Sequence, residues 1–300
     1  MIEITVLGSA ATMPLPGRAL SSVLLKYNGR TILFDCGEGT QTAARRCGAS
    51  LMKTDLIALS HYHGDHIFGL PGLLQSFGCL GRKDPLCFCG PEGLKAALEP
   101  VLRLAGPLPY PVYFSLIQAD GIDFHGARLS AFPVKHRVPC FGYEFVLPRA
   151  GKFDVSKAEA LGVPPQLRSA LQHGESVTLE GRLIEPGMVM GPPRKGLKIV
   201  LSGDTSPCSS LLEHASGADL LICDGTYGSD DCLPDALKYG HSTFSGAAAL
   251  AAEAEVRELW LSHFSQMMET PEEFLPNAAD IFPASFCAYD GMCKTFRFEA

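Results

Sequence analysis

The sequence lacks the features of several protein classes. No apolar run approaches the roughly 20 residues that a membrane-spanning helix needs. Residues 1–8 alternate apolar and polar side chains like a first strand, without the basic start and long apolar centre of a secretory signal. There is no short-period repeat and no low-complexity tract. We therefore expect neither a membrane protein nor a secreted or repetitive one.

Positive charge is also scarce. Lys and Arg number 25 against 32 Asp and Glu, so the net charge is -7, which argues against nonspecific nucleic-acid binding but allows a local basic patch. Residues 149–198 reverse the sign, with eight basic and five acidic residues, a net of +3. Many Gly and Pro residues in this segment are expected to interrupt every possible element, which predicts an inserted arm over 149–198. The arm is either a solvated loop or a surface that binds a polyanion.

The cysteines do not form a disulfide framework. They number 11, an odd count, and many lie in apolar runs such as the one ending at Cys223. Reduced, mostly buried thiols are the better interpretation, and they indicate a cytoplasmic protein. Cys87 and Cys89 are too close in sequence for a usual zinc pair, and we predict that they belong to a strand.

A chain of 300 residues with 46% hydrophobic content can bury a large core, and we expect one domain over 1–300. Its elements form two halves, each a sheet with helices outside. This predicts the α/β class, an αββα sandwich of two mixed sheets flanked by helices, with strand ends at one shared edge. The predicted strands are 2–7, 22–27, 31–35, 55–60, 129–134, 140–147, 198–202, 219–224 and 258–262, and the predicted helices are 40–47, 67–74, 93–104, 209–215 and 242–253.

The segment Ser60 to His66 crowds four side chains that bind transition metals into six positions. They are His61, His63, Asp65 and His66. The segment follows a predicted strand, so the histidines lie on a turn at a strand's carboxyl end, where ligands collect in α/β sheets. Imidazole and carboxylate groups suit zinc and similar metals. The cluster therefore predicts a metal site.

One loop cannot supply all the ligands that two metal ions need. Three further strand ends offer candidate ligands. His136 follows the strand 129–134, Asp204 follows 198–202, and His263 follows 258–262. An Asp after a single strand is commonly a helix cap. Three such residues, added to the first cluster, indicate a larger metal centre.

Taken together, these motifs resemble the metallo-β-lactamase superfamily and, within it, the ribonuclease Z family of tRNA 3′-processing endoribonucleases. Finer matches are Phe34 to Gln41, His136 to Pro139 with Gly142 and Tyr143, Gly240 to Thr243, and in the arm Lys157 to Pro165 and Gly191 to Arg194. The resemblance is collinear over nearly the whole chain.

The resemblance implies two zinc ions per subunit, with manganese or another divalent metal as the alternative. One ion would be held by His61, His63 and His136 and the other by Asp65, His66 and His263, with Asp204 bridging. Two metals can clamp the attacking and leaving oxygens of a phosphodiester. The implied function is a zinc-dependent endoribonuclease that cleaves precursor tRNA 3′ trailers, acting as a homodimer.

Further roles follow from the same resemblance. Asp65 would also handle a proton in catalysis, and His241 would stabilise phosphate oxygens or protonate the leaving 3′ oxygen. Asp224, in a position where many relatives carry glutamate, would orient His241. Asp35 is expected to support the metal loop through hydrogen bonds. In the arm, Arg168, Arg194 and Lys195 are the predicted RNA contacts.

The chain departs from the family pattern in residues that handle substrate. Ser265 is followed by Gln266, Met267 and Met268 where the family commonly has Ser-Arg-Tyr, Pro165 is followed by Gln166, and Ala19 replaces a usual asparagine. The alternative function is therefore a phosphodiesterase of the same fold that acts on small or cyclic phosphodiesters. A metal-free RNA-binding or scaffold protein is a third class, which the complete ligand set opposes.

Overall fold

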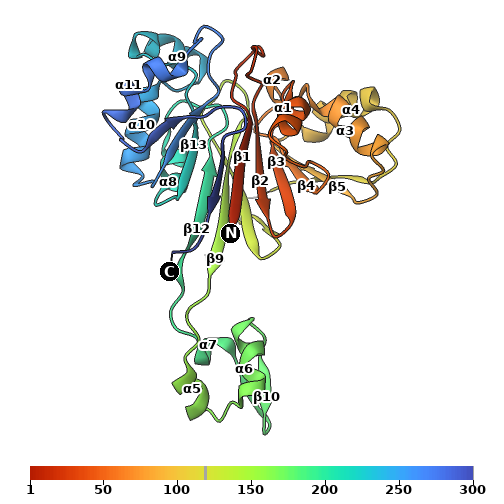
Figure 1. Cartoon of the computed structure of the whole chain (residues 1–300), viewed down its shortest axis with the longest axis vertical. Coiled ribbons are helices and arrows are strands. Elements are labelled where there is room, and N and C mark those ends of the chain that lie inside the picture. The colour runs from red at the N-terminus through yellow and green to blue at the C-terminus, as the bar shows by residue number, and fades with distance from the viewer. Residues whose placement is uncertain (118–119, 300) are drawn as a thin grey trace. The chain divides into compact units, whose positions relative to one another are not determined.

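The computed structural model describes residues 1–117 and 120–299 and divides into two compact units (Figure 1). The first unit comprises Met1–Val146 and Lys198–Ala300, and the second comprises Leu147–Leu197. None of the helices in the described residues has the length and apolarity that spanning a membrane requires.

The first unit is built on two sheets, each of seven strands in the described residues. The first sheet has the order β16 (Cys293–Phe296), β1 (Ile2–Gly8), β2 (Ser22–Tyr27), β3 (Arg30–Phe34), β4 (Thr54–Ala58), β5 (Leu86–Cys89) and β6 (Val112–Ser115). The second has the order β15 (Ser285–Cys287), β14 (Leu259–Ser262), β13 (Leu220–Asp224), β12 (Arg194–Leu201), β9 (Phe141–Arg149), β8 (Ala127–Pro133) and β7 (Ile122–Phe124).

Helices cover the outer face of each sheet (Figure 1). The first sheet packs against α1 (Thr40–Arg46), α3 (Leu70–Cys79) and α4 (Leu94–Ala105), and the second against α8 (Ser209–Ala215), α10 (Phe244–Glu253) and α11 (Pro276–Ala279). Shorter elements are α2 (Gly64–Ile67), η1 (Asp230–Cys232), α9 (Leu233–Tyr239) and η2 (Pro271–Phe274). Aromatic pairs join the inner faces, with ring centroids 5.5 Å apart for Phe34 and Tyr143. The predicted αββα sandwich is confirmed.

Parallel strands bring the chemistry-bearing residues to one edge of the sandwich. Strands β3 to β6 are parallel in the first sheet, and β12 to β15 are parallel in the second. Asp35 and Ser60 lie just beyond β3 and β4, while Asp204 and His263 lie just beyond β12 and β14. The carboxyl ends of both sheets therefore face one site.

The structure corrects two expectations about local elements. The helix predicted over 67–74 is interrupted, because α2 ends at Ile67 and α3 begins at Leu70. Pro71 stands in the first turn of α3, where its missing N–H costs no helical hydrogen bond. Strands β6, β7, β15 and β16 were not predicted, since each has only three or four residues, too few to show a clear period.

The second unit contradicts the expectation that Gly and Pro interrupt every element of the arm. It contains α5 (Val155–Ala160), α6 (Pro165–Gln172), β10 (Val177–Leu179), β11 (Arg182–Ile184) and α7 (Pro186–Val189). Pro165 and Pro186 start helices instead of breaking them, and the Asp154 carboxylate caps α5 by accepting the Lys157 N–H at 3.1 Å. Its own small core is formed by Ala158, Val163, Leu171, Val177, Ile184 and Val189.

Candidate metal centre

The loop after β4 is held by a buried carboxylate. Asp35 accepts hydrogen bonds from the backbone N–H of Ser60 at 2.7 Å, from Ser60 Oγ at 2.8 Å and from His66 Nδ1 at 2.8 Å. Its φ of 55° is an uncommon, strained backbone conformation of the kind that clusters at functional sites. Because Nδ1 donates to Asp35, Nε2 is the ring nitrogen of His66 that faces the cluster. The expected supporting role of Asp35 is confirmed.

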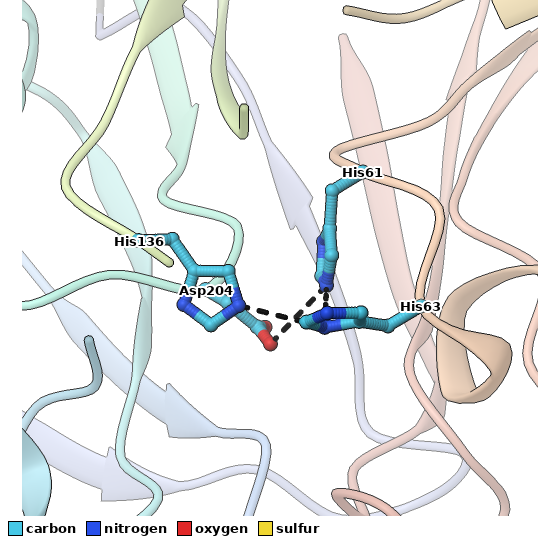
Figure 2. Close-up of side chains that lie close together, drawn as sticks. All are labelled: His61, His63, His136 and Asp204. Carbon is cyan, nitrogen blue, oxygen red and sulfur yellow. Dashed lines mark hydrogen bonds and ion pairs between the residues drawn. The ribbon is translucent and has the colours of Figure 1, made fainter. Parts of the chain in front are cut away.

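A first group of donor atoms joins the two sheets. His61 and His63 come from the loop after β4, His136 from the loop after β8 and Asp204 from the loop after β12 (Figure 2). One donor atom from each lies within 4.8 Å of the others. His61 Nε2 lies 2.8 Å from His63 Nδ1 and 3.6 Å from Asp204 Oδ2. Gly240 O accepts a hydrogen bond from His136 Nδ1 at 2.9 Å, which leaves Nε2 turned inward.

A second group shares the same carboxylate. Asp65, His66 and His263 have donor atoms within 4.8 Å of one another. His263 Nε2 lies 3.5 Å from Asp65 Oδ2 and 3.4 Å from Asp204 Oδ2, and His66 Nε2 lies 3.4 Å from Asp204 Oδ1. Asp204 thus stands between the two groups, one oxygen toward His66 and the other toward His61 and His263.

Neighbouring groups orient the second set. Asp65 Oδ2 accepts the backbone N–H of Thr12 at 2.8 Å, and Thr226 Oγ1 lies 2.9 Å from His263 Nδ1. The backbone φ of Thr12 and of His263 is positive, at 60° and 62°. A strained backbone conformation persists only where the surrounding structure fixes it. Here it directs the Thr12 N–H and the His263 ring toward Asp65.

The electrostatics of the cluster favour a bound cation. Asp35, Asp65, Asp204 and Asp224 are largely buried, and within the described residues their ion-pair partners are histidines. Although burial opposes its charge, the pKa of Asp204 is lowered by His263, His66 and His61. Burial together with His66 lowers the pKa of His61 to about 2, so this imidazole is neutral and can donate a lone pair.

The donor set fits a divalent metal. Two imidazole nitrogens 2.8 Å apart, as in His61 and His63, repel each other unless a proton or a cation lies between them. Nitrogen and carboxylate oxygen donors are what zinc and similar ions bind. The structure therefore brings together all seven residues that the sequence pointed to as ligands. Asp204 belongs to the first group and lies within 3.4 Å of His66 and His263 of the second. A further combination, Asp204, Asp224, His241 and His263, also has donor atoms within 4.8 Å of one another.

His241 and Asp224 form a pair beside these groups. His241 Nδ1 lies 2.7 Å from Asp224 Oδ2. Asp224 also accepts from the backbone N–H groups of Thr205 and Thr226 and from the Thr226 hydroxyl, so its oxygens are already occupied and it is poorly placed to bind a metal. Although burial opposes a charged imidazole, Asp224 raises the pKa of His241 to about 9. His241 is thus held as a cation at neutral pH.

Some residues of the site were missed by the sequence reasoning. Thr226 bridges Asp224 and His263, and the sequence analysis assigned it no role. Gly203 has a φ of 62°, and a Cβ there would lie 2.7 Å from Phe141 O, so the turn before Asp204 requires glycine. Such contacts depend on chain segments far apart in sequence, which no local signal reveals.

The predicted RNA contacts of the arm lie within the second unit. Arg168 donates to Val163 O at 3.2 Å and pairs with Glu159 at 3.4 Å, and Arg194 donates to Ala150 O at 2.9 Å. Lys195 is exposed. The two arginines thus support the arm's own structure, and their contact with RNA stays a prediction.

Comparisons with known proteins agree with this site. Residues 15–140 match the family model of the metallo-β-lactamase superfamily. The chain is 42% identical to a ribonuclease Z of Lachnospira eligens and 41% identical to one of Clostridium beijerinckii, in each case over 100% of this chain and 99% of the relative. The crystal structure of human tRNase Z, short form, is similar with a TM-score of 0.70 and 26% identity, over 99% of this chain and 100% of that one. The chain belongs to the ribonuclease Z family of the metallo-β-lactamase superfamily.

Proposed function

We propose that this protein is a metal-dependent endoribonuclease that removes the 3′ trailer from precursor tRNA by cutting after the discriminator nucleotide. The observation that carries the proposal is the convergence of seven His and Asp side chains, from loops of both sheets, beside the His241–Asp224 pair. Relatives about 40% identical over their full length are named ribonuclease Z, which supports the same activity.

We assign the residues as follows. His61, His63 and His136 would hold one metal ion, Asp65, His66 and His263 would hold a second, and Asp204 would serve both. Metals bound there would polarise the phosphodiester and make water a better nucleophile at neutral pH. Zinc is the metal that we propose. Each ion would have three ligands of its own and the shared Asp204, and zinc binds such sets of four imidazole and carboxylate donors.

The chain's own groups supply proton transfer and charge. The Asp65 carboxylate, oriented by the Thr12 N–H, accepts the proton of the attacking water. The charged His241 imidazole, fixed by Asp224, stabilises the phosphate oxygens and donates a proton to the leaving 3′ oxygen. The products would be a tRNA with a 3′ hydroxyl and a trailer with a 5′ phosphate.

The second unit is proposed to bind the body of the tRNA. We propose one domain over 1–300 with an arm over 149–198 that grips phosphates through Arg168, Arg194 and Lys195. Such contacts carry little sequence information and weaken with salt. We also propose that the protein works in the cytoplasm as a homodimer, in which one subunit's arm can serve the other's site.

The test is to incubate the purified, metal-quantified protein with a precursor tRNA bearing a trailer and to map the cut to the nucleotide. We expect one cut after the discriminator, and none with His61→Ala. Turnover of a small aryl phosphodiester is measured beside it. Efficient turnover of that small substrate without cleavage of the precursor would overturn the proposal in favour of a small-molecule phosphodiesterase.

A further inference from the structure

A large exposed aromatic side chain lies in the cleft of the candidate metal centre. Phe68 is 67% exposed, and it lines the same cleft as His63, Asp65, Asp204 and His263. The candidate metal ligands around it are polar or charged, and the other apolar side chains that line the cleft are Pro14 and Leu20. An aromatic ring that is mostly exposed beside these donor atoms is available to a substrate.

The ring is held in a defined position. Phe68 caps the end of α2, with its N–H donating to Gly64 O at 2.8 Å. Its ring lies against Gly64, where an added Cβ would come within 2.3 Å of the ring carbons. The next residue, Gly69, donates its N–H to Cys36 O at 2.9 Å and packs on Gly37 too closely for a Cβ. The aromatic group is thus anchored to the strand end that carries Asp35.

The ring also lies close to the residues that would bind the scissile phosphate. Asp65 lies one turn before Phe68 on α2, so the ring is fixed next to a predicted metal ligand. A phosphodiester bound at the metals would place the nucleotides on its two sides along the walls of this cleft. Arg137, which lines the cleft as well, offers a cation for an adjacent phosphate.

We propose that Phe68 is a stacking platform for the nucleobase on one side of the scissile phosphate. This inference rests on the proposed function, and it deepens that function by naming the part of the substrate that the cleft binds. Stacking of a base on an aromatic ring contributes binding without requiring a particular base. The cleft would therefore favour single-stranded RNA at the cut over phosphodiesters that lack a base.

The test compares variants on precursor tRNA with and without bases at the cut. Phe68→Ala should lower kcat/KM by roughly 10-fold or more, the size expected for loss of one base–aromatic stack. Phe68→Trp should retain the wild-type value and Phe68→Leu should not. Leu104→Ala, which truncates a 76% exposed side chain on α4, is the matched control and should change nothing. Metal content and melting temperature should be the same in all variants.

Abasic substrates then locate the stacked base. One substrate lacks the base just before the cut, and another lacks the base just after it. Wild type should lose activity on one of the two, and on that substrate Phe68→Ala should have no further effect. The stacking role is wrong if Phe68→Ala lowers kcat/KM equally on the intact precursor and on both abasic substrates. It is also wrong if Phe68→Ala keeps the wild-type kcat/KM or loses its bound metal. Failure of wild type to cut any precursor would instead overturn the proposed function itself.

Discussion

Replacing Asp35 by Asn tests whether this buried carboxylate determines the metal affinity of the site. Asp35 receives three hydrogen bonds within 2.8 Å, from Ser60 N, Ser60 Oγ and His66 Nδ1. An asparagine keeps one acceptor oxygen and turns the other into an NH₂ donor. If the oxygen still accepts the Ser60 N–H, the NH₂ faces His66 Nδ1. His66 then moves its proton to Nε2, the atom that faces Asp204.

The expected magnitude follows from this change of tautomer. Loss of a carboxylate that orients a metal-binding histidine typically lowers metal affinity or activity about 10- to 100-fold, which is about 1.4 to 2.7 kcal/mol. The unpaired buried groups should also lower the free energy of unfolding by about 1 to 3 kcal/mol. The assay is competition with a chelator of known affinity, with cleavage of a trailer-bearing tRNA followed at rising metal concentration. High metal should restore much of the lost activity.

The control is Asp219→Asn. Asp219 is also a buried carboxylate, and it accepts the Lys198 N–H at 2.9 Å and pairs with Arg257 at 3.2 Å, at the opposite end of β13 from the site. This variant should lose stability and keep its metal affinity. If Asp35→Asn bound metal as tightly as wild type while its melting temperature fell like that of the control, the argument from the His66 tautomer would be wrong.

Three further predictions follow from the same geometry. Asp204→Ala should abolish turnover and keep the fold, which circular dichroism and cleavage assays would show together; full activity would contradict a shared carboxylate. Activity that needs a charged His241 should fall as pH rises through about 9, and Asp224→Asn should move that fall to lower pH, so an unmoved pH profile would contradict the pairing. Deleting residues 152–195 should raise KM for precursor tRNA and reduce its salt dependence while leaving turnover of a small aryl phosphodiester unchanged; unchanged KM would contradict the role of the arm.

Much of the site could be predicted because its residues follow strands. His61, Asp204 and His263 each come just after a buried apolar run, and parallel strands bring such positions to one edge of the fold. The support of the metal loop by Asp35 was expected from the family resemblance, and its hydrogen bonds to Ser60 and His66 agree with it. The structure bears out these placements, while the metal ions that they bind stay a proposal.

Other features could not be predicted because they depend on contacts between distant segments. The Thr12 N–H reaches Asp65 only through a loop with a positive φ, and Thr226 joins Asp224 to His263 across two loops. Phe68 reads in the sequence as part of an apolar run, and only the structure shows it exposed in the cleft. The arm was misjudged because Pro165 and Pro186 look like breakers when their places in a helix are unknown.

The most direct test of the account is a titration of metal into the metal-free protein while cleavage of a trailer-bearing precursor tRNA is followed. The two donor groups, with Asp204 in contact with both, predict that cleavage is absent without metal and reaches its plateau at two ions per chain. Asp204→Ala should show no such plateau. Full cleavage without bound metal, or a plateau at one ion per chain, would contradict the two-metal centre.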